Sequence, residues 1–380
     1  MKQGIYIHIP FCKQACSYCN FFFSTRQHYI PDFVNRLKAE IEQLPSQLTQ
    51  HPPETLYFGG GTPSLIPLED FSGIIKTLNN RFDLTGLQET TLEVNPDDIT
   101  AEKLDYWLEL GITRLSVGVQ SFDENLLRFM HRAHDRATAE SALKMIKSAG
   151  FTNFSVDIIY GNPGQTTEML ALDIDRFLDF DPPHISAYAL TIEPKTRLGK
   201  MEELGRLTQA DEETVIAHSE LLQQKLEDAG LERYEISNYA RPGFRAVHNS
   251  NYWVHQPYIG LGPGAHGFRW DKDKKSGIRT IRRPDLKSYI NEGFTSTEET
   301  EELCLKTLAE ERFMTGLRIS EGVSLSELEH RYCYRFNQRQ LSMLSEFERQ
   351  GWIQSRDPLQ LSREGWHRAD RITLELLAAG

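Results

Sequence analysis

Three cysteines within eight residues, Cys12, Cys16 and Cys19, constrain this chain more than any other feature of its sequence. They follow directly after an apolar run at residues 6–10, which has the pattern of a first strand. A zinc site normally takes four protein ligands, and a cubane iron–sulfur cluster normally takes four cysteines. A cluster held by these three thiolates alone leaves one iron open to a chelating small molecule. Two alternatives remain: a zinc site completed by His8 or a distant cysteine, and three cysteines that pack as small apolar residues.

Composition limits the class of protein. The sequence has 380 residues, of which 39% are hydrophobic and 25% charged, which is enough for one large domain and a smaller one. Its net charge of −12 argues against broad nucleic-acid binding. We find no run of about 18 apolar residues and expect no transmembrane segment, which leaves peripheral membrane contact open. The odd, clustered set of cysteines and the lack of a signal segment predict a cytoplasmic protein. We expect it to be a monomer or a dimer.

The first two thirds of the chain alternate short apolar runs with longer amphipathic stretches, the pattern of β–α units around a parallel sheet. Strands are predicted at residues 5–9, 55–58, 90–94, 114–119, 154–159 and 185–190. The predicted fold class is therefore α/β, with a partial (β/α)6 barrel. Because function in such barrels lies at the C-terminal ends of the strands, we expect the cysteines and the polar residues that follow the strands at one rim.

The change of pattern along the chain predicts three regions. Residues 1–195 form the partial barrel core, and residues 196–297 form an extension that includes a strand at 234–238 and a glycine- and aromatic-rich stretch. Residues 298–380 are predicted to be a mainly helical, winged-helix-like C-terminal domain with a hairpin at 352–361. The simplest use of such a domain is packing or protein contact.

Three consecutive glycines at residues 59–61, followed by Thr62, come directly after the second predicted strand. Without a Cβ, backbone of this kind can approach a ligand closely, although a triple glycine is equally compatible with a tight turn. Other polar residues stand near the ends of the later strands or just beyond them: Glu93, Gln120, Arg132 and Asp157. Each of them alone is more simply a structural polar group. Their shared placement at the rim favours a binding site.

Together, the CxxxCxxC spacing and the GGGTP loop resemble the radical S-adenosylmethionine (SAM) superfamily. The resemblance implies a [4Fe–4S] cluster on Cys12, Cys16 and Cys19, whose open iron is chelated by the amino and carboxylate groups of SAM. An acid suits the SAM ammonium, an arginine suits its carboxylate, and Asp or Gln suits the ribose. The positions that the resemblance assigns to SAM are Tyr6, Tyr18, Gly60, Gly61, Thr62, Glu93, Gln120, Arg132, Asp157 and Ala189.

Residues 6–191 resemble most closely the branch that contains oxygen-independent coproporphyrinogen III dehydrogenase. That dehydrogenase has a fourth cysteine two residues after the third, where this chain has Phe21. It also has a substantial segment before the cluster, and this chain starts too close to Cys12 to hold one. Both departures are shared with a sister group, the HemW-type heme chaperones, which the chain resembles over nearly its full length.

The resemblance extends to the sequence His248-Asn-Ser-Asn-Tyr-Trp253, an HNxxYW motif linked to heme binding in the sister group. It implies that His248 binds heme. An imidazole can ligate heme iron, and Tyr252 and Trp253 can cover porphyrin faces. Spacing alone favours a satisfied histidine with two core aromatic residues. His255 and His266 are alternative ligands nearby.

The surroundings of this motif lead to two further predictions. The glycine-rich stretch at residues 260–267 is expected to form a tight loop that closes over the barrel mouth, or a plain multiple turn. The acidic overall charge does not attract heme propionates, so Arg241, Arg245 or Arg269 is expected to offset it locally.

The main hypothesis is a heme chaperone that binds a [4Fe–4S] cluster, SAM and heme, and hands heme to acceptor proteins. The first alternative is the oxidative decarboxylation of coproporphyrinogen III by a 5′-deoxyadenosyl radical. Phe21 and the short N-terminus predict that this dehydrogenase activity is absent. The second alternative is a cluster-bearing scaffold that binds partner proteins through its C-terminal domain. We assign no catalytic residue and expect no nucleic-acid partner.

Overall fold

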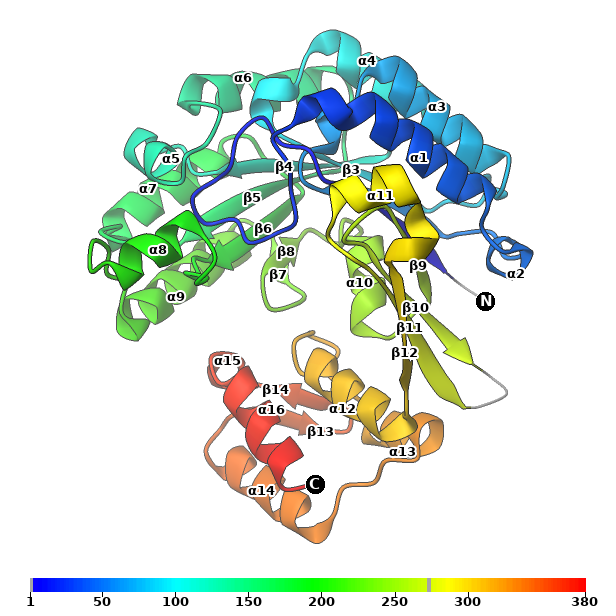
Figure 1. Ribbon diagram of the computed structural model, residues 1–380. Helices are drawn as coiled ribbons and strands as arrows, with labels where there is room; N and C mark the ends of the chain where they lie inside the picture. Colours follow the sequence, from blue (N-terminus) through cyan, green and yellow to red (C-terminus); the bar gives the residue numbers. More distant parts are fainter. Residues whose placement is uncertain (1–2, 272–274) are drawn as a thin grey trace.

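Six parallel strands form the centre of the structure, a computed structural model that describes residues 3–271 and 275–380 (Figure 1). They are β1 (Gly4–Ile9), β2 (Thr55–Gly60), β3 (Glu89–Val94), β4 (Arg114–Gln120), β5 (Phe154–Tyr160) and β6 (His184–Ala189). Each pairs in parallel with the next along the chain. Apolar side chains such as Ile7, Leu92 and Val117 are buried in the main core. The predicted partial (β/α)6 barrel is confirmed.

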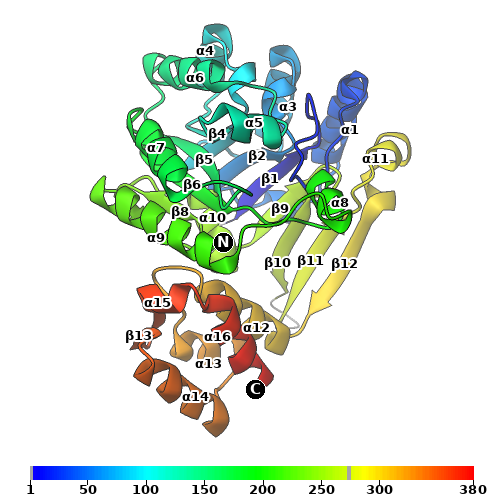
Figure 2. The ribbon, with the colours of Figure 1, turned by 90° about the vertical axis from the view of Figure 1, so that its left-hand side faces the viewer.

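Helices alternate with the strands, and most of them cover the outer side of the sheet (Figures 1 and 2). They are α1 (Ile30–Glu42), α2 (Ser46–Thr49), α3 (Leu68–Asn79), α4 (Ala101–Glu109), α5 (Glu124–Phe129), α6 (Arg136–Ser148), α7 (Thr167–Leu178), α8 (Arg197–Glu203) and α9 (Glu212–Asp228). Of these, α2 is a short connection before β2, and α8 contacts the loop that carries the cysteines. Helix α1 buries Phe33, Leu37 and Ile41, whose four-residue spacing places them on one face. Within the described residues, none of the helices combines the length and the apolar character needed to cross a membrane.

The sheet continues beyond the six central strands at both edges. Next to β1 lie β9 (Tyr258–Leu261), β10 (His266–Asp271), β11 (Ser276–Arg282) and β12 (Glu298–Leu303), and next to β6 lie β8 (Asn238–Ala240) and β7 (Glu232–Arg233). Strand β9 is parallel to β1, and the remaining pairs outside the six central strands are antiparallel. The predicted strand at 234–238 is wrong except at its last residue, because residues 234–237 lie between β7 and β8, and Asn238 begins β8. The Glu235 carboxylate there accepts a hydrogen bond from the Ser237 backbone N–H at 3.2 Å and bends the chain.

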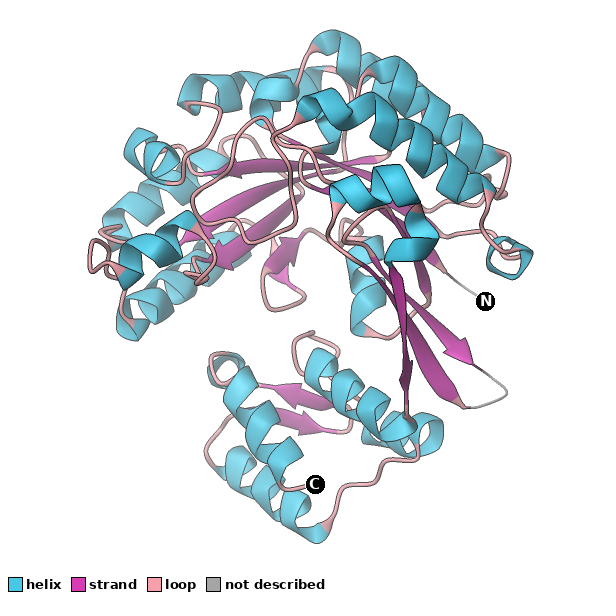
Figure 3. Ribbon diagram, in the orientation of Figure 1, coloured by secondary structure: helices cyan, strands magenta, loops and turns pink. Residues whose placement is uncertain are grey.

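The C-terminal elements form a separate, mainly helical unit with a short hairpin (Figure 3), and this unit has a second hydrophobic core. Its elements are α12 (Leu305–Gly316), α13 (Leu325–Tyr332), α14 (Gln338–Arg349), β13 (Ile353–Arg356), β14 (Leu359–Leu361), α15 (Arg363–Trp366) and α16 (Ala369–Ala378). Phe268 of β10 belongs to this core, so the sheet extension joins the C-terminal helices to the barrel. The domain limits at residues 195 and 297 stay predictions, and they leave β12 with the C-terminal part although it pairs with β11.

Two short helices and four 3-10 turns complete the connections. The helices are α10 (Val247–Trp253) and α11 (Leu286–Glu292), and the turns are η1 (Gln27–Tyr29), η2 (Pro63–Leu65), η3 (Pro96–Asp98) and η4 (Phe294–Thr297). Turns η2 and η3 directly follow β2 and β3. Because β1 to β6 are parallel, the loops that follow them meet at one edge of the sheet, which is where the sequence places its polar motifs.

Candidate functional site

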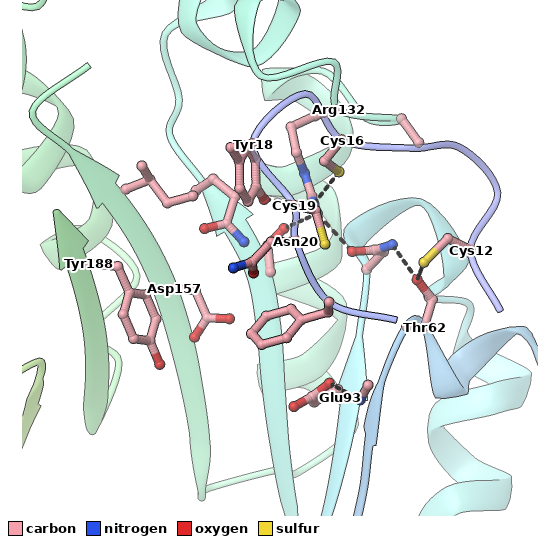
Figure 4. Close-up of a pocket in the computed structure, with 18 of the residues that line it drawn as sticks. Cys12, Cys16, Tyr18, Cys19, Asn20, Thr62, Glu93, Arg132, Asp157 and Tyr188 are labelled. Carbon is pink, nitrogen blue, oxygen red and sulfur yellow. Dashed lines mark hydrogen bonds between the residues drawn. The ribbon is translucent and has the colours of Figure 1, made fainter. Parts of the chain in front are cut away.

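The three cysteines lie on the loop that follows β1, and this loop crosses the C-terminal ends of the neighbouring strands (Figure 4). Polar contacts tie it to segments that follow β3 and β4. The Lys13 ammonium pairs with the Asp97 carboxylate at 2.6 Å, and the Ser17 backbone N–H donates to the Met130 carbonyl at 3.0 Å. The protein itself therefore holds the cysteine loop in place.

The triple-glycine loop packs against the start of the cysteine loop. The backbone N–H of Thr62 donates to the Phe11 carbonyl oxygen at 2.6 Å, and a Cβ on Gly61 would meet the same oxygen at 2.7 Å. Gly60 has a φ of +110°, and a Cβ there would lie 2.6 Å from the His8 ring. Only glycine combines this backbone conformation with this close approach. The glycines therefore bring the two loops together at the rim.

A chain of side-chain contacts connects two of the three cysteines (Figure 4). Arg132 Nη1 donates to the Cys16 sulfur at 3.2 Å, and Nη2 donates to Asn95 Oδ1 at 2.7 Å. Asn95 Nδ2 in turn donates to Thr62 Oγ1 at 3.1 Å, and the Thr62 hydroxyl lies 3.6 Å from the Cys12 sulfur. Asn95 was among the residues that sequence reasoning left without a role. Its position two residues beyond Glu93, at the end of β3, was the available signal.

Two acidic side chains face this site from β3 and β5. Glu93 accepts hydrogen bonds from the Tyr57 hydroxyl at 2.7 Å and from the Gly60 backbone N–H at 3.0 Å. Burial, with a smaller contribution from the charge of Asp157, raises the pKa of Glu93 to about 7. Burial also raises the pKa of Asp157 to about 6, and its buried Oδ1 has no hydrogen-bond partner among the described residues. Such a pair favours a cationic ligand, which would stabilise the ionised carboxylates.

Three other predicted residues border the same space. Gln120, at the end of β4, is buried and has a φ of +72°, a left-handed conformation that is uncommon outside glycine and frequent at functional sites. The Tyr18 hydroxyl accepts a hydrogen bond from Arg132 Nη1 at 3.3 Å. Ala189 ends β6 at the same rim.

A cavity of about 450 Å³, here called the cluster cavity, gathers these side chains. The predicted residues that line it are Cys12, Cys16, Tyr18, Cys19, Gly60, Gly61, Thr62, Glu93, Gln120, Arg132, Asp157 and Ala189. Its wall also includes Asn95, Phe21 and Tyr188, to which sequence reasoning assigned no ligand contact. Phe21 is 69% exposed, which is unusual for a large apolar side chain.

Tyr6 and His248 are the predicted residues that do not line the cluster cavity. The Tyr6 hydroxyl lies 3.1 Å from His8 Nδ1, and the Tyr6 ring stacks near the His248 ring. His248 is 2% exposed on α10, and both of its ring nitrogens are hydrogen-bonded. Nδ1 lies 2.8 Å from Thr55 Oγ1, and Nε2 lies 2.7 Å from the Tyr252 hydroxyl. In this arrangement neither nitrogen has a free lone pair for a metal.

The stretch at residues 260–267 forms the turn of the β9–β10 hairpin, with both strands contributing to it. Of the arginines predicted near heme propionates, Arg241 pairs with Asp181 and Arg245 pairs with Glu321. Their charges are therefore already compensated within the protein.

The site fits the cluster and the SAM molecule that the sequence predicts. Burial raises the pKa of the Cys12 thiol to about 12, and a metal that binds thiolate would displace this proton. No three His, Cys, Asp or Glu side chains within residues 3–271 and 275–380 approach closely enough to hold a single ion. A cubane gives each thiolate its own iron, so its ligands stand farther apart than those of one zinc ion. The acid pair and Arg132 offer opposite charges to the two charged ends of an amino acid.

Two families match parts of the chain. Residues 6–177 match the radical SAM superfamily, which covers all of β1 to β5 apart from the first two residues of β1. Residues 303–367 match the HemN C-terminal domain, which begins at the end of β12 and reaches the segment after α15.

The chain is similar to curated proteins over almost its whole length. It is 33% identical over 371 residues to "Heme chaperone HemW" of Bacillus subtilis, covering 96% of each chain. It is 32% identical over 321 residues to the Escherichia coli protein of the same name, covering 84% of this chain and 83% of the other.

Among solved structures, the coproporphyrinogen III oxidase HemN from Escherichia coli has a similar fold. The TM-score is 0.83 at 21% identity, over 99% of this chain and 89% of that chain. At this identity the likeness concerns the fold alone. The relatives, by contrast, exceed 30% identity across nearly the full chain, and the predicted resemblance is confirmed. The chain belongs to the HemW family of heme chaperones within the radical SAM superfamily.

Proposed function

We propose that this protein binds a [4Fe–4S] cluster, SAM and heme, and hands heme to acceptor proteins. The observation that carries the proposal is the cluster cavity, in which three thiols, a half-buried arginine and two half-buried carboxylates share one space. The relatives that match almost the whole chain are heme chaperones by name. The net charge of −12 does not favour nucleic acid as a partner.

In this proposal, Cys12, Cys16 and Cys19 hold the cluster. Glu93 and Arg132 bind the ammonium and the carboxylate of SAM, since each offers the opposite charge. Asp157, with its unpartnered Oδ1, accepts a hydrogen bond from SAM. The remaining SAM contacts are Tyr6, Tyr18, Gly60, Gly61, Thr62, Gln120 and Ala189. When bound, the cluster supplies an electron that can cleave the SAM sulfonium.

Phe21 favours the chaperone over the decarboxylating dehydrogenase. It occupies the position of that enzyme's fourth cysteine, and its exposed ring lines the cluster cavity. An aromatic ring cannot supply the thiol that the dehydrogenase has there, and it presents an apolar face where a planar ligand can stack. Heme is proposed to bind beside this site, against the segment of α10 that contains the HNxxYW motif of His248.

The test is an anaerobic incubation of the reconstituted protein with SAM, a reductant, and either hemin or coproporphyrinogen III. We expect a heme spectrum that changes as the protein is titrated, transfer of heme to an apo-heme protein, and no protoporphyrinogen. SAM-dependent formation of protoporphyrinogen would assign the protein to the dehydrogenase alternative.

A Phe21 variant tests whether the fourth thiol alone separates this protein from the dehydrogenase. Phe21→Cys restores the dehydrogenase's fourth thiol while the rest of the cavity stays unchanged. Under the proposal this variant still forms no protoporphyrinogen, because the missing thiol is one of several differences. Absence of heme binding by the unaltered protein contradicts the chaperone proposal directly.

A further inference from the structure

Two further cavities extend from the cluster cavity toward the C-terminal helices. The inner cavity, of about 300 Å³, is lined by His8, Phe22 and Ile281, and it shares Phe21 and Glu93 with the cluster cavity. The outer cavity, of about 460 Å³, lies between the β9–β10 hairpin and α12. The inner and outer cavities share Tyr6, Gly264 and His266. The three cavities therefore follow one another across the molecule.

The histidines around these two cavities differ in the state of their ring nitrogens. His8 Nδ1 lies 3.1 Å from the Tyr6 hydroxyl, and its Nε2 lies 3.0 Å from the Phe22 carbonyl oxygen. His255 Nδ1 lies 3.2 Å from the Tyr332 hydroxyl, and its Nε2 lies 3.9 Å from a carboxylate oxygen of Glu311. With the nitrogens of His248 also engaged, these three rings are held by the protein.

His266 differs from them, because its ring makes no hydrogen bond or ion pair with any residue that the structure describes. It begins β10, its side chain is exposed, and it lines both cavities where they meet. Partial desolvation of the ring by the cavity walls, with a smaller contribution from the charge of Arg279, lowers the pKa of His266, which favours the neutral ring. A neutral imidazole with a free lone pair is the form that ligates a metal.

Glycines place His266 at this point. A Cβ on Gly260 would lie 1.9 Å from the His266 carbonyl oxygen, so only glycine lets β9 approach β10 here. Gly264, two residues before His266, has a φ of +87° and faces the Phe22 ring. The glycine-rich stretch at residues 260–267 therefore holds the His266 imidazole where the inner and outer cavities meet.

The walls of the outer cavity suit a flat apolar ligand. Tyr252, Tyr258 and Phe268 contribute aromatic rings, and Met314, which is 37% exposed, contributes a flexible thioether side chain. Arg279 adds a positive charge at the same wall, although it is paired with Glu311 at 2.7 Å.

We propose that heme, the cargo of the proposed chaperone function on which this inference rests, enters the outer cavity and is ligated through its iron by His266, while His248 acts as a positioning residue. The ring of His248 holds the Tyr252 hydroxyl at 2.7 Å, and the Tyr252 ring packs edge-on against Tyr258 with 4.6 Å between centroids. His248 therefore orients the cavity wall from behind without reaching the ligand.

Hemin titration of the full chain with reconstituted cluster tests this assignment, followed by Soret absorbance and electron paramagnetic resonance. His266→Ala should shift the Soret band and weaken hemin binding at least tenfold, and free imidazole should restore the original spectrum. His266→Tyr should give the spectrum of phenolate-ligated ferric heme, because the donor atom then changes at the same place.

The control variants are His255→Ala and His248→Asn. Both should keep the Soret position of the unaltered protein, since neither removes the ligand. Tyr252→Phe should reproduce any loss of affinity seen in His248→Asn, because it deletes the other end of the same hydrogen bond.

The possible failures can be told apart. If the unaltered protein binds hemin and His266→Ala keeps its spectrum and affinity, the ligand assignment is overturned while the chaperone function stands. If His248→Asn alone moves the Soret band, His248 is the ligand and the assignment is again overturned. If the unaltered protein does not bind hemin, the proposed function and this inference fail together.

Discussion

Arg132 and Cys16 are in direct contact, with the guanidinium Nη1 donating to the thiol sulfur at 3.2 Å. The contact places a half-buried positive charge beside a predicted cluster ligand and, through Asn95 and Thr62, links it to Cys12 on the other side of the loop. Arg132 is therefore positioned both to stabilise thiolate charge and to meet a carboxylate in the cluster cavity.

Replacement of any loop cysteine should remove the cluster. Cys12→Ala, Cys16→Ala and Cys19→Ala each leave two thiolates, which are too few to hold a cubane, so the broad visible absorption of the reconstituted protein should disappear. Iron and sulfide analysis measures this directly. Cys304→Ala and Cys333→Ala are the controls, since both of these thiols are exposed and remote from the cavity. A full complement of iron and sulfide in Cys16→Ala would refute the ligand set.

Arg132→Ala should weaken SAM binding. The loss of a charged hydrogen-bond partner costs about 1.5–3 kcal/mol, so the dissociation constant should rise by roughly tenfold to a hundredfold. Isothermal titration with cluster-loaded protein measures the effect. Arg128→Ala is a matched control, because Arg128 lies on α5 and its guanidinium donates to Asn125 outside the cavity. Equal SAM affinity in both variants, with the cluster intact, would exclude Arg132 from the binding site.

SAM binding should depend on pH through Glu93. Its pKa is raised to about 7, so the carboxylate is largely neutral at pH 6 and largely ionised at pH 8. Only the ionised form attracts the SAM ammonium, and for a single group with this pKa the affinity should fall by about tenfold between pH 8 and pH 6. Glu93→Gln should bind more weakly and lose this pH dependence. A pH dependence that persists in Glu93→Gln would assign the titration to another group.

Glu93 should also make the stability of the fold depend on pH. Rising pH should strengthen SAM binding but lower the stability of the protein without SAM. Because the folded state raises the pKa of Glu93, its contribution to stability is present at low pH and is lost as pH rises through about 7. The protein without SAM should therefore melt at a lower temperature at pH 8 than at pH 6, and the difference should shrink in Glu93→Gln. Thermal unfolding at the two pH values measures it.

Gly60→Ala should disrupt the contact between the glycine loop and the cysteine loop. A Cβ at a φ of +110° and 2.6 Å from the His8 ring is strained, which costs about 1–3 kcal/mol. Both the melting temperature and the SAM affinity should fall. Gly86→Ala is the control, because a Cβ there meets nothing within 4 Å. Equal melting temperatures for the two variants would show that the loop adapts.

The central strands could be predicted from sequence because strands buried on both faces of a sheet appear as short apolar runs. Strand 154–159, for example, is observed as β5 (Phe154–Tyr160). The edge strands β7 and β8 were misplaced, because strands of two and three residues leave almost no periodic signal. Strands β9 and β10 were hidden within a glycine-rich stretch that also predicts turns.

The sequence predicts which polar residues lie at the rim of the barrel, but it does not predict which residues they contact. The spacing of Arg132 predicts a position after β4, whereas its contacts with Cys16 and Asn95 depend on three loops meeting in space. The motif at His248 shows the same limit. The motif predicts a functional region, but the sequence does not show that Thr55 and Tyr252 form hydrogen bonds with the two ring nitrogens of His248.

The wall between the cluster cavity and the inner cavity is made of shared residues, Phe21, Gly60 and Glu93. A ligand that fixes the Phe21 ring from one side changes the surface presented on the other side. Occupancy of the SAM site and of the inner cavity should therefore be energetically coupled. The inner cavity meets the outer cavity at His266, the proposed heme ligand. Reciprocity then requires that SAM alter the affinity for heme by the same factor by which heme alters the affinity for SAM, so cargo loading can report on whether SAM is bound.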